Sequence, residues 1–203
     1  MKNSHDGQVI SIGGSELRYT DTGSGNAVLL LQPVLNQTLA GQLASNFRVI
    51  AVEVQDPSKV LQTPKLLSLF LKQLSLSKCC LIAQSDLAFV AIEHAIESVD
   101  SVEALVLIAP IMPGGSSGAP SDPALEEIRT PALVLFGTRD QVVAPETGRT
   151  FARRIPKCFY TLVYDAGHDI GADRPQALRA IVQDFLEHRE KFVVPQDGSA
   201  INP

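Results

Sequence analysis

A chain of 203 residues with 45% hydrophobic and 19% charged residues has the size and composition of one globular domain. Its net charge of -5, without a basic cluster, excludes nucleic acid as an expected partner. No apolar run approaches the roughly 18 residues of a membrane-spanning helix, and the polar residues 1–7 hold no signal-peptide core. We therefore expect a cytoplasmic protein.

The cysteines and histidines predict neither a disulfide framework nor a metal site. The three cysteines are an odd number, and we interpret them as small hydrophobic residues in a reducing compartment. The four histidines form no short pair with cysteines or carboxylates at ligand spacing. His94 lies between Glu93 and Glu97 in a helical pattern, so we expect it at the surface. We expect no metal and no cofactor.

Taken in order, the chain alternates apolar segments of strand length with amphipathic segments at helical spacing. The predicted strands are 8–12, 16–20, 27–31, 48–54, 79–83, 102–109, 132–136 and 159–164, and the predicted helices are 38–45, 66–74, 88–95, 145–155 and 175–188. This alternation predicts a three-layer α/β/α sandwich around a mostly parallel sheet of eight strands, the first two antiparallel. We expect one domain over residues 1–194 and a polar tail, 195–203, without a packing pattern.

The stretch 78–95 passes from a strand into a helix without a Gly or Pro between them. Its apolar run ends at Ala83, and helical spacing begins at Ala88. A strand that continues directly into a helix must turn sharply, and Ser85 lies at that corner. A residue there projects away from the sheet, beside the N–H groups at the start of the helix, which stabilise an anion. The corner therefore suits a nucleophile.

Three residues of complementary chemistry follow predicted strands of the sheet. Ser85 follows the fifth strand, Asp140 the seventh and His168 the eighth. The carboxyl ends of parallel strands carry the working residues of such sheets. A serine hydroxyl is a weak nucleophile until an imidazole takes its proton, and a buried carboxylate holds that imidazole in the correct tautomer.

The segments Pro-Ala-Leu-Val-Leu-Phe-Gly-Thr-Arg-Asp (131–140) and Ala-Gly-His (166–168) resemble the acid and histidine segments of the α/β-hydrolase family. Together with the corner at Ser85, they extend this resemblance over residues 8–192. It implies the α/β-hydrolase fold, with Ser85 as nucleophile, His168 as base and Asp140 as acid. It also implies oxyanion donors at the backbone N–H groups of Val34 and Asp86. The substrate contacts would be Gln32, Pro33, Leu87, Ile111 and Val142.

The chain departs from the family pattern at several positions. Gly-x-Ser-x-Gly becomes Ala83-x-Ser85-x-Leu87, and the His-Gly after the third strand becomes Gln32-Pro33. Only about twenty residues separate Pro110 from Pro131, where most relatives carry a helical lid, so we expect no lid domain and an open site.

Several alternatives stay open. Ser85 could be a buried helix cap, Asp140 a turn residue, and Asp86 either a helix cap or the nucleophile, as in dehalogenase-like relatives. The favoured hypothesis is a serine hydrolase that cleaves carboxylic esters or thioesters through an acyl-enzyme intermediate. Its partner would be a small-molecule ester or acyl substrate, free or presented by a carrier or protein partner. The alternatives are a catalytically weak pseudo-hydrolase that binds a ligand or protein, and a lyase or cyclase on the same scaffold.

Overall fold

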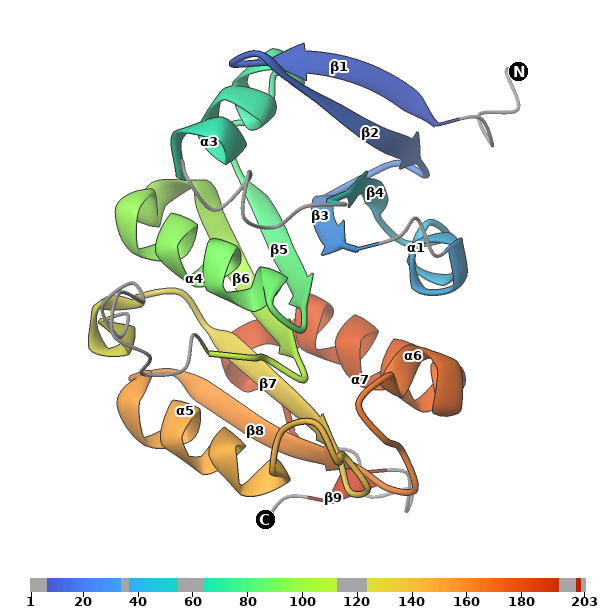
Figure 1. Ribbon diagram of the computed structural model, residues 1–203, viewed down its shortest axis with the longest axis vertical. Helices are drawn as coiled ribbons and strands as arrows, with labels where there is room; N and C mark the ends of the chain where they lie inside the picture. Colours follow the sequence, from blue (N-terminus) through green and yellow to red (C-terminus); the bar gives the residue numbers. More distant parts are fainter. Residues whose placement is uncertain (1–6, 34–36, 55–63, 113–123, 194–199, 202–203) are drawn as a thin grey trace.

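The computed structural model describes residues 7–33, 37–54, 64–112, 124–193 and 200–201 (Figure 1). The strands are β1 (Gln8–Ile12), β2 (Ser15–Thr22), β3 (Ala27–Gln32), β4 (Arg48–Glu53), β5 (Cys79–Gln84), β6 (Val102–Ile108), β7 (Ala132–Gly137), β8 (Cys158–Val163) and β9 (Ala200–Ile201). The helices are α1 (Gln37–Leu43), α3 (Pro64–Gln73), α4 (Leu87–Glu97), α5 (Gly148–Arg154), α6 (Ile170–Asp173) and α7 (Pro175–His188). Short 3-10 turns occupy 99–101, 125–127, 145–147 and 189–191.

One sheet in the order β1-β2-β4-β3-β5-β6-β7-β8-β9 contains all the strands of the described residues. The strands from β4 to β8 run parallel, while β1 pairs with β2, β2 with β4, and β8 with β9 in antiparallel register. The parallel strands carry almost continuous apolar runs because both faces of the sheet are covered. The predicted mostly parallel sheet and its antiparallel start are confirmed.

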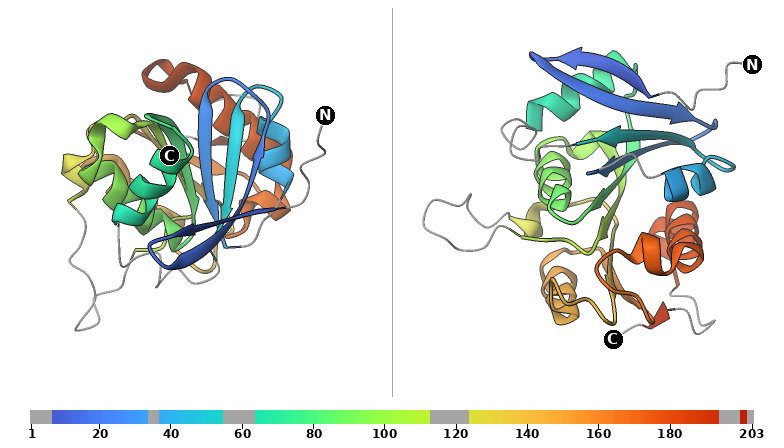
Figure 2. Two further views of the ribbon diagram at one scale, coloured as in Figure 1. Left: turned by 90° about the horizontal axis from the view of Figure 1, so that it is seen from above. Right: turned by 45° about the vertical axis from the view of Figure 1, so that its right-hand side comes forward.

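Helices cover both faces of this sheet, as the sequence predicts. Figures 1 and 2 show α3, α4 and α5 along one face and α1, α6 and α7 along the other. Two buried clusters fill the interfaces: Phe70, Leu87 and Phe151 belong to the first, and Leu43 and Phe185 to the second. The three-layer α/β/α architecture is therefore confirmed.

The strand count was predicted as eight, and the described residues form nine strands. The additional strand, β9, lies in the tail that we expected to have no packing pattern, and it pairs with Leu162 and Val163 of β8. A two-residue strand is too short to show the alternation from which strands are predicted. The prediction for the tail is therefore wrong at Ala200 and Ile201.

His94 is also placed differently from the prediction. Its side chain is buried, and its Nε2 lies 3.1 Å from Ser101 Oγ. The helix α4 is apolar on most of its circumference, and the turn 99–101 folds back against it. His94 therefore belongs to the core on that face of the sheet, and the expectation of a surface position is wrong.

No helix in the described part of the chain has the length and apolar character needed to cross a membrane. The connection from β6 to β7 spans residues 109–131, of which 113–123 lie outside the described residues. A connection of that length has no room for a lid domain, since a domain of its own core needs several times as many residues.

Candidate active site

Ser85 occupies the turn between β5 and α4 in a strained backbone conformation. Its φ is 58°, in the left-handed region that non-glycine residues rarely adopt. Its N–H donates to the carbonyl of Ile108 at 2.9 Å. Its own carbonyl accepts hydrogen bonds from the N–H groups of Ala88 at 3.2 Å and Ile111 at 3.0 Å. Such backbone strain costs about 1–3 kcal/mol and persists only where neighbouring contacts hold the conformation. The three hydrogen bonds of the Ser85 backbone are contacts of this kind.

Leu87 replaces the second glycine of the family pattern without blocking this turn. It is the first residue of α4, and its side chain is fully buried in the cluster between that helix and the sheet. The side chain thus points into the core and leaves the corner itself free. This placement argues against the predicted substrate contact at Leu87, because the side chain exposes no surface. The other substitution, Ala83, is also fully buried at the end of β5.

His168 lies between Ser85 and Asp140. Its Nε2 is 3.2 Å from Ser85 Oγ, and its Nδ1 is 2.9 Å from Asp140 Oδ2. The Asp140 side chain has no exposed surface, while that of His168 is 20% exposed. The three residues that follow β5, β7 and β8 therefore form one continuous hydrogen-bonded chain from an accessible hydroxyl to a buried carboxylate.

The second oxygen of Asp140 fixes its own carboxylate. Oδ1 accepts hydrogen bonds from the N–H groups of Val142 at 2.9 Å and Val143 at 3.0 Å. Asp140 is thus both the turn residue of one alternative and the partner of His168, with a different oxygen in each role. The two backbone donors hold the carboxylate in the orientation in which Oδ2 faces His168 Nδ1.

The distances also bear on the alternatives at the corner. The N-cap residue of α4 is Asp86, so Ser85 is not the buried cap that one alternative assumed. The Asp86 side chain makes no capping hydrogen bond and is exposed to solvent. The imidazole of His168 faces the hydroxyl of Ser85, which favours Ser85 over Asp86 as the nucleophile.

The loops that carry the acid and the histidine touch at Gly137. A Cβ at this position would lie 2.2 Å from the carbonyl oxygen of Ala166 and 2.3 Å from that of Gly167. The backbone N–H of Arg139 donates to the carbonyl of Ala166 at 2.8 Å. Sequence reasoning missed this role of Gly137, although its place directly after a predicted strand is a signal for a close approach of two backbones.

Two further groups that sequence reasoning missed hold the histidine loop. The carboxylate of Asp173 accepts a hydrogen bond from the N–H of Gly167 at 2.7 Å, one residue before His168. The guanidinium of Arg139 donates to the carbonyl of Asp165 at 2.9 Å and forms an ion pair with its carboxylate at 3.2 Å. Both contacts join residues that no local pattern connects.

The predicted oxyanion donors are only partly described. The N–H of Asp86 lies at the start of α4, and no backbone acceptor for it is found within the described ranges. Val34 lies outside the described residues. A helix N-terminus with a free N–H group suits a developing negative charge beside Ser85.

The remaining predicted substrate contacts differ in exposure. Gln32 is buried, Pro33 is exposed, Ile111 is half-buried and Val142 is 63% exposed. Val142 lies two residues after Asp140, to which its N–H donates, and offers a large apolar side chain to solvent. Of these four residues, Pro33, Ile111 and Val142 therefore expose surface that a substrate could contact.

The cysteines lack the properties of a nucleophile. Burial raises the pKa of Cys79 and Cys158 to about 12 and that of Cys80 to about 11. A reactive cysteine has a lowered pKa, because the thiolate is the nucleophile. Within residues 7–33, 37–54, 64–112, 124–193 and 200–201, no group of three or more His, Cys, Asp or Glu side chains could hold a metal ion.

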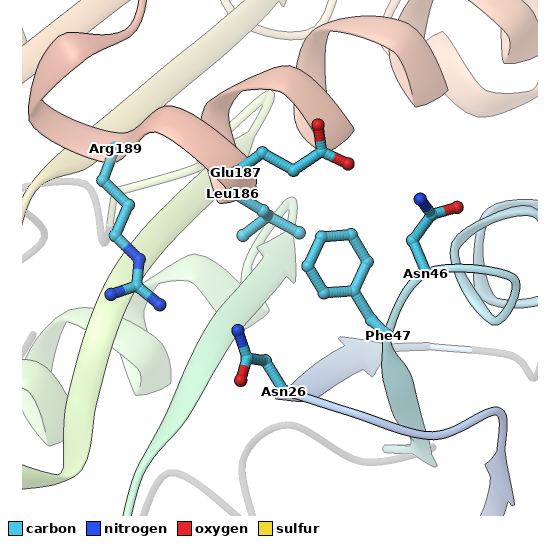
Figure 3. Close-up of a pocket in the computed structure, with 6 residues that line it drawn as sticks. All are labelled: Asn26, Asn46, Phe47, Leu186, Glu187 and Arg189. Carbon is cyan, nitrogen blue, oxygen red and sulfur yellow. The ribbon is translucent and has the colours of Figure 1, made fainter.

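A cavity of about 440 Å³ lies away from these residues (Figure 3). It is lined by Asn26, Asn46, Phe47, Leu186, Glu187 and Arg189. Asn26 precedes β3 and Phe47 precedes β4, so the cavity lies at the amino ends of the parallel strands, opposite Ser85. Its lining holds no serine, histidine or cysteine.

Comparisons with known proteins agree with this topology. No family model matches the sequence. Protein ABHD14A of Rattus norvegicus is 26% identical over 151 residues, which are 70% of this chain and 60% of the rat protein's length. Carboxylesterase CesB from Bacillus subtilis superposes with a TM-score of 0.77 at 14% identity, covering 89% of this chain and 91% of the other. A thermophilic esterase from Thermogutta terrifontis gives 0.76 at 20% identity, covering 90% and 98%. The chain therefore has the α/β-hydrolase fold.

Proposed function

We propose that this α/β-hydrolase-fold protein is a serine hydrolase that cleaves carboxylic esters or thioesters through Ser85, His168 and Asp140. The observation that carries the proposal is the hydrogen-bonded chain from Ser85 Oγ to His168 Nε2 at 3.2 Å and from His168 Nδ1 to Asp140 Oδ2 at 2.9 Å. The left-handed φ of Ser85 supports it, because strained nucleophile turns of this kind present a hydroxyl at the end of a strand.

In the first half of the reaction, Ser85 Oγ attacks the carbonyl carbon of the substrate and His168 Nε2 takes the hydroxyl proton. Asp140 stabilises the imidazolium through its hydrogen bond to Nδ1. Collapse of the tetrahedral intermediate expels the alcohol or thiol, to which His168 returns the proton. An acyl group then remains on Ser85.

In the second half, His168 removes a proton from water, and the resulting hydroxide attacks the acyl carbon. The second tetrahedral intermediate collapses to release a carboxylic acid, and the proton returns to Ser85 Oγ. We infer that the N–H groups of Asp86 and Val34 donate to the oxyanion in both halves. These groups account for every proton that the reaction moves.

The second candidate is a pseudo-hydrolase that binds a small ligand or a protein partner. The observation that favours it is the replacement of the family's His-Gly by Gln32 and Pro33 beside the second oxyanion donor, of which Gln32 is buried and Pro33 is exposed. The loss of one oxyanion donor lowers the rate of hydrolysis by about 100- to 1000-fold. Because that donor acts on the transition state, a protein without it would still bind acyl compounds.

Covalent labelling with a fluorophosphonate probe separates these candidates, because the probe reacts only with an activated serine. We expect wild type to be labelled on Ser85, as mapped by peptide mass spectrometry, and the variants Ser85→Ala and His168→Ala to remain unlabelled. His188→Ala is the matched control, since His188 is an exposed histidine on α7. A folded wild type that takes no label would contradict the hydrolase proposal and leave the pseudo-hydrolase.

A further inference from the structure

The residue after the nucleophile carries an exposed carboxylate at the start of α4. Asp86 is the N-cap residue of α4, yet its side chain makes no capping hydrogen bond and is exposed to solvent. Its Cα lies about 3.8 Å from that of Ser85, as in any pair of consecutive residues. The carboxylate of Asp86 therefore extends from the backbone position directly after that of Ser85.

We propose that the Asp86 carboxylate makes this site select against acyl groups that carry a negative charge, so that its substrates are uncharged or cationic esters and thioesters. The inference rests on the proposed function and names the substrate class of that same site.

The sign of the electrostatic field at Ser85 depends on how the positive end of α4 compares with the nearby carboxylates. The N-terminus of α4 is equivalent to about half a positive charge, spread over several N–H groups. The carboxylate of Asp86 is a full negative charge at the same end of the helix, and that of Asp140 is a second one behind His168. The base His168 must itself be uncharged to accept the proton of Ser85. The sum of these described groups is therefore negative.

Two arginines of the described acid and histidine segments, Arg139 and Arg174, are paired with other groups. Arg139 directly precedes Asp140, but its guanidinium forms an ion pair with Asp165 at 3.2 Å. Arg174, between α6 and α7, donates to the carbonyl of Tyr164 at 2.8 Å. Because Asp86 directly follows Ser85, we expect the charge of an anionic acyl group bound at Ser85 to lie within about the Debye length of the Asp86 carboxylate, which is about 8 Å at physiological ionic strength.

The test compares two esters that differ only at the end of the acyl chain: 4-nitrophenyl hexanoate, and the mono-4-nitrophenyl ester of adipic acid, in which a carboxylate replaces the terminal methyl group. The measured quantity is the ratio of kcat/KM for the adipate to that for the hexanoate, after subtraction of spontaneous hydrolysis. The developing oxyanion is common to both esters, so its contribution cancels in the ratio.

We expect wild type to prefer the hexanoate and Asp86→Asn to raise the ratio by about 3- to 10-fold, as expected for two charges roughly 7 Å apart near a protein surface and screened at physiological ionic strength. Asp86→Lys should raise it further. Asp100→Asn is the matched control, because Asp100 is an exposed aspartate just beyond the other end of α4, roughly 16 Å away. Its ratio should equal that of wild type.

A measurement without variants gives an independent reading. Raising the ionic strength screens the repulsion, so the wild-type ratio should increase with salt and that of Asp86→Asn should not. The inference is overturned if the ratio is the same in wild type and Asp86→Asn, or if Asp100→Asn shifts it equally. Hexanoate hydrolysis that survives in Ser85→Ala would overturn the proposed function as well, whereas an unchanged ratio with Ser85-dependent hydrolysis overturns this inference alone.

Discussion

Gly137 and Ala166 lie so close together that a Cβ on residue 137 would be 2.2 Å from the carbonyl oxygen of Ala166. Gly137 ends β7, three residues before Asp140, and Ala166 lies two residues before His168. The loops that carry Asp140 and His168 can approach this closely only because residue 137 has no side chain. The 2.9 Å contact between Asp140 and His168 depends on that approach.

We predict that Gly137→Ala lowers kcat at least 10-fold and destabilises the protein by about 1–3 kcal/mol, because backbone must move to admit the methyl group. Ester hydrolysis and chemical denaturation measure the two effects. Gly41→Ala is the control: a Cβ there meets nothing within 4 Å, and alanine in helix α1 should stabilise the protein by about 0.5–1 kcal/mol. Unchanged activity and stability in Gly137→Ala would contradict the role assigned to this contact.

Asp173 should act as a positioning residue through the hydrogen bond that it accepts from the N–H of Gly167 at 2.7 Å. We predict that Asp173→Ala lowers kcat by about 3- to 10-fold at unchanged KM, because the loop loses an anchor one residue before His168 while the substrate surface is untouched. Asp173→Asn keeps an acceptor oxygen and should restore most of the rate.

The matched control for Asp173 is Asp184→Ala, which removes an aspartate from the surface of α7, where its partner is His188. Its kcat should equal that of wild type. An effect on KM alone, or an equal loss of rate in the alanine and asparagine variants, would argue against positioning through this hydrogen bond.

The sequence was sufficient to predict the architecture and to select three residues that the structure brings together. Ser85, Asp140 and His168 each follow an apolar strand, and parallel strands bring their carboxyl ends to one edge, so local patterns determine the neighbourhood. His94 was misplaced because helical periodicity does not say whether the turn 99–101 covers that side of α4. Gly137 acts through a contact between two separate loops, and Asp173 bonds back across α6 to Gly167, a contact that no periodic pattern in the sequence indicates.

Leu87 offers a test of whether the family glycine pattern is needed here. We predict that Leu87→Gly destabilises the protein by about 3–5 kcal/mol, since it removes a fully buried side chain from the core under α4. Activity per folded molecule should not increase, because the turn already forms with leucine present.

Denaturant titration and an active-site titration with the fluorophosphonate probe give stability and activity per folded molecule of Leu87→Gly separately. Leu87→Met is the control, since a change that conserves volume should destabilise the protein by less than about 1.5 kcal/mol. A glycine variant that is both as stable as wild type and faster would mean that Leu87 obstructs the site.

The thiols should resist alkylation in the native protein. Cys79 and Cys158 have a pKa raised to about 12 and Cys80 one raised to about 11, because burial disfavours the thiolate. At pH 8 we predict negligible labelling by iodoacetamide over an hour, with activity retained, and three labels per chain after denaturation, as measured by intact mass. Rapid labelling at pH 8 of a native protein that loses activity would instead indicate a thiolate at the site.

The same pKa values predict how stability depends on pH. In the unfolded chain the thiols titrate near their ordinary pKa of about 8.5. Between that pH and about 11–12 the native state therefore holds protons that the unfolded state has lost, so the free energy of unfolding must fall as the pH rises. Urea denaturation at pH 7, 9 and 10 should give a free energy of unfolding that is already lower at pH 9 than at pH 7 and lower again at pH 10. A free energy of unfolding that is constant to pH 10 would contradict the burial of these thiols.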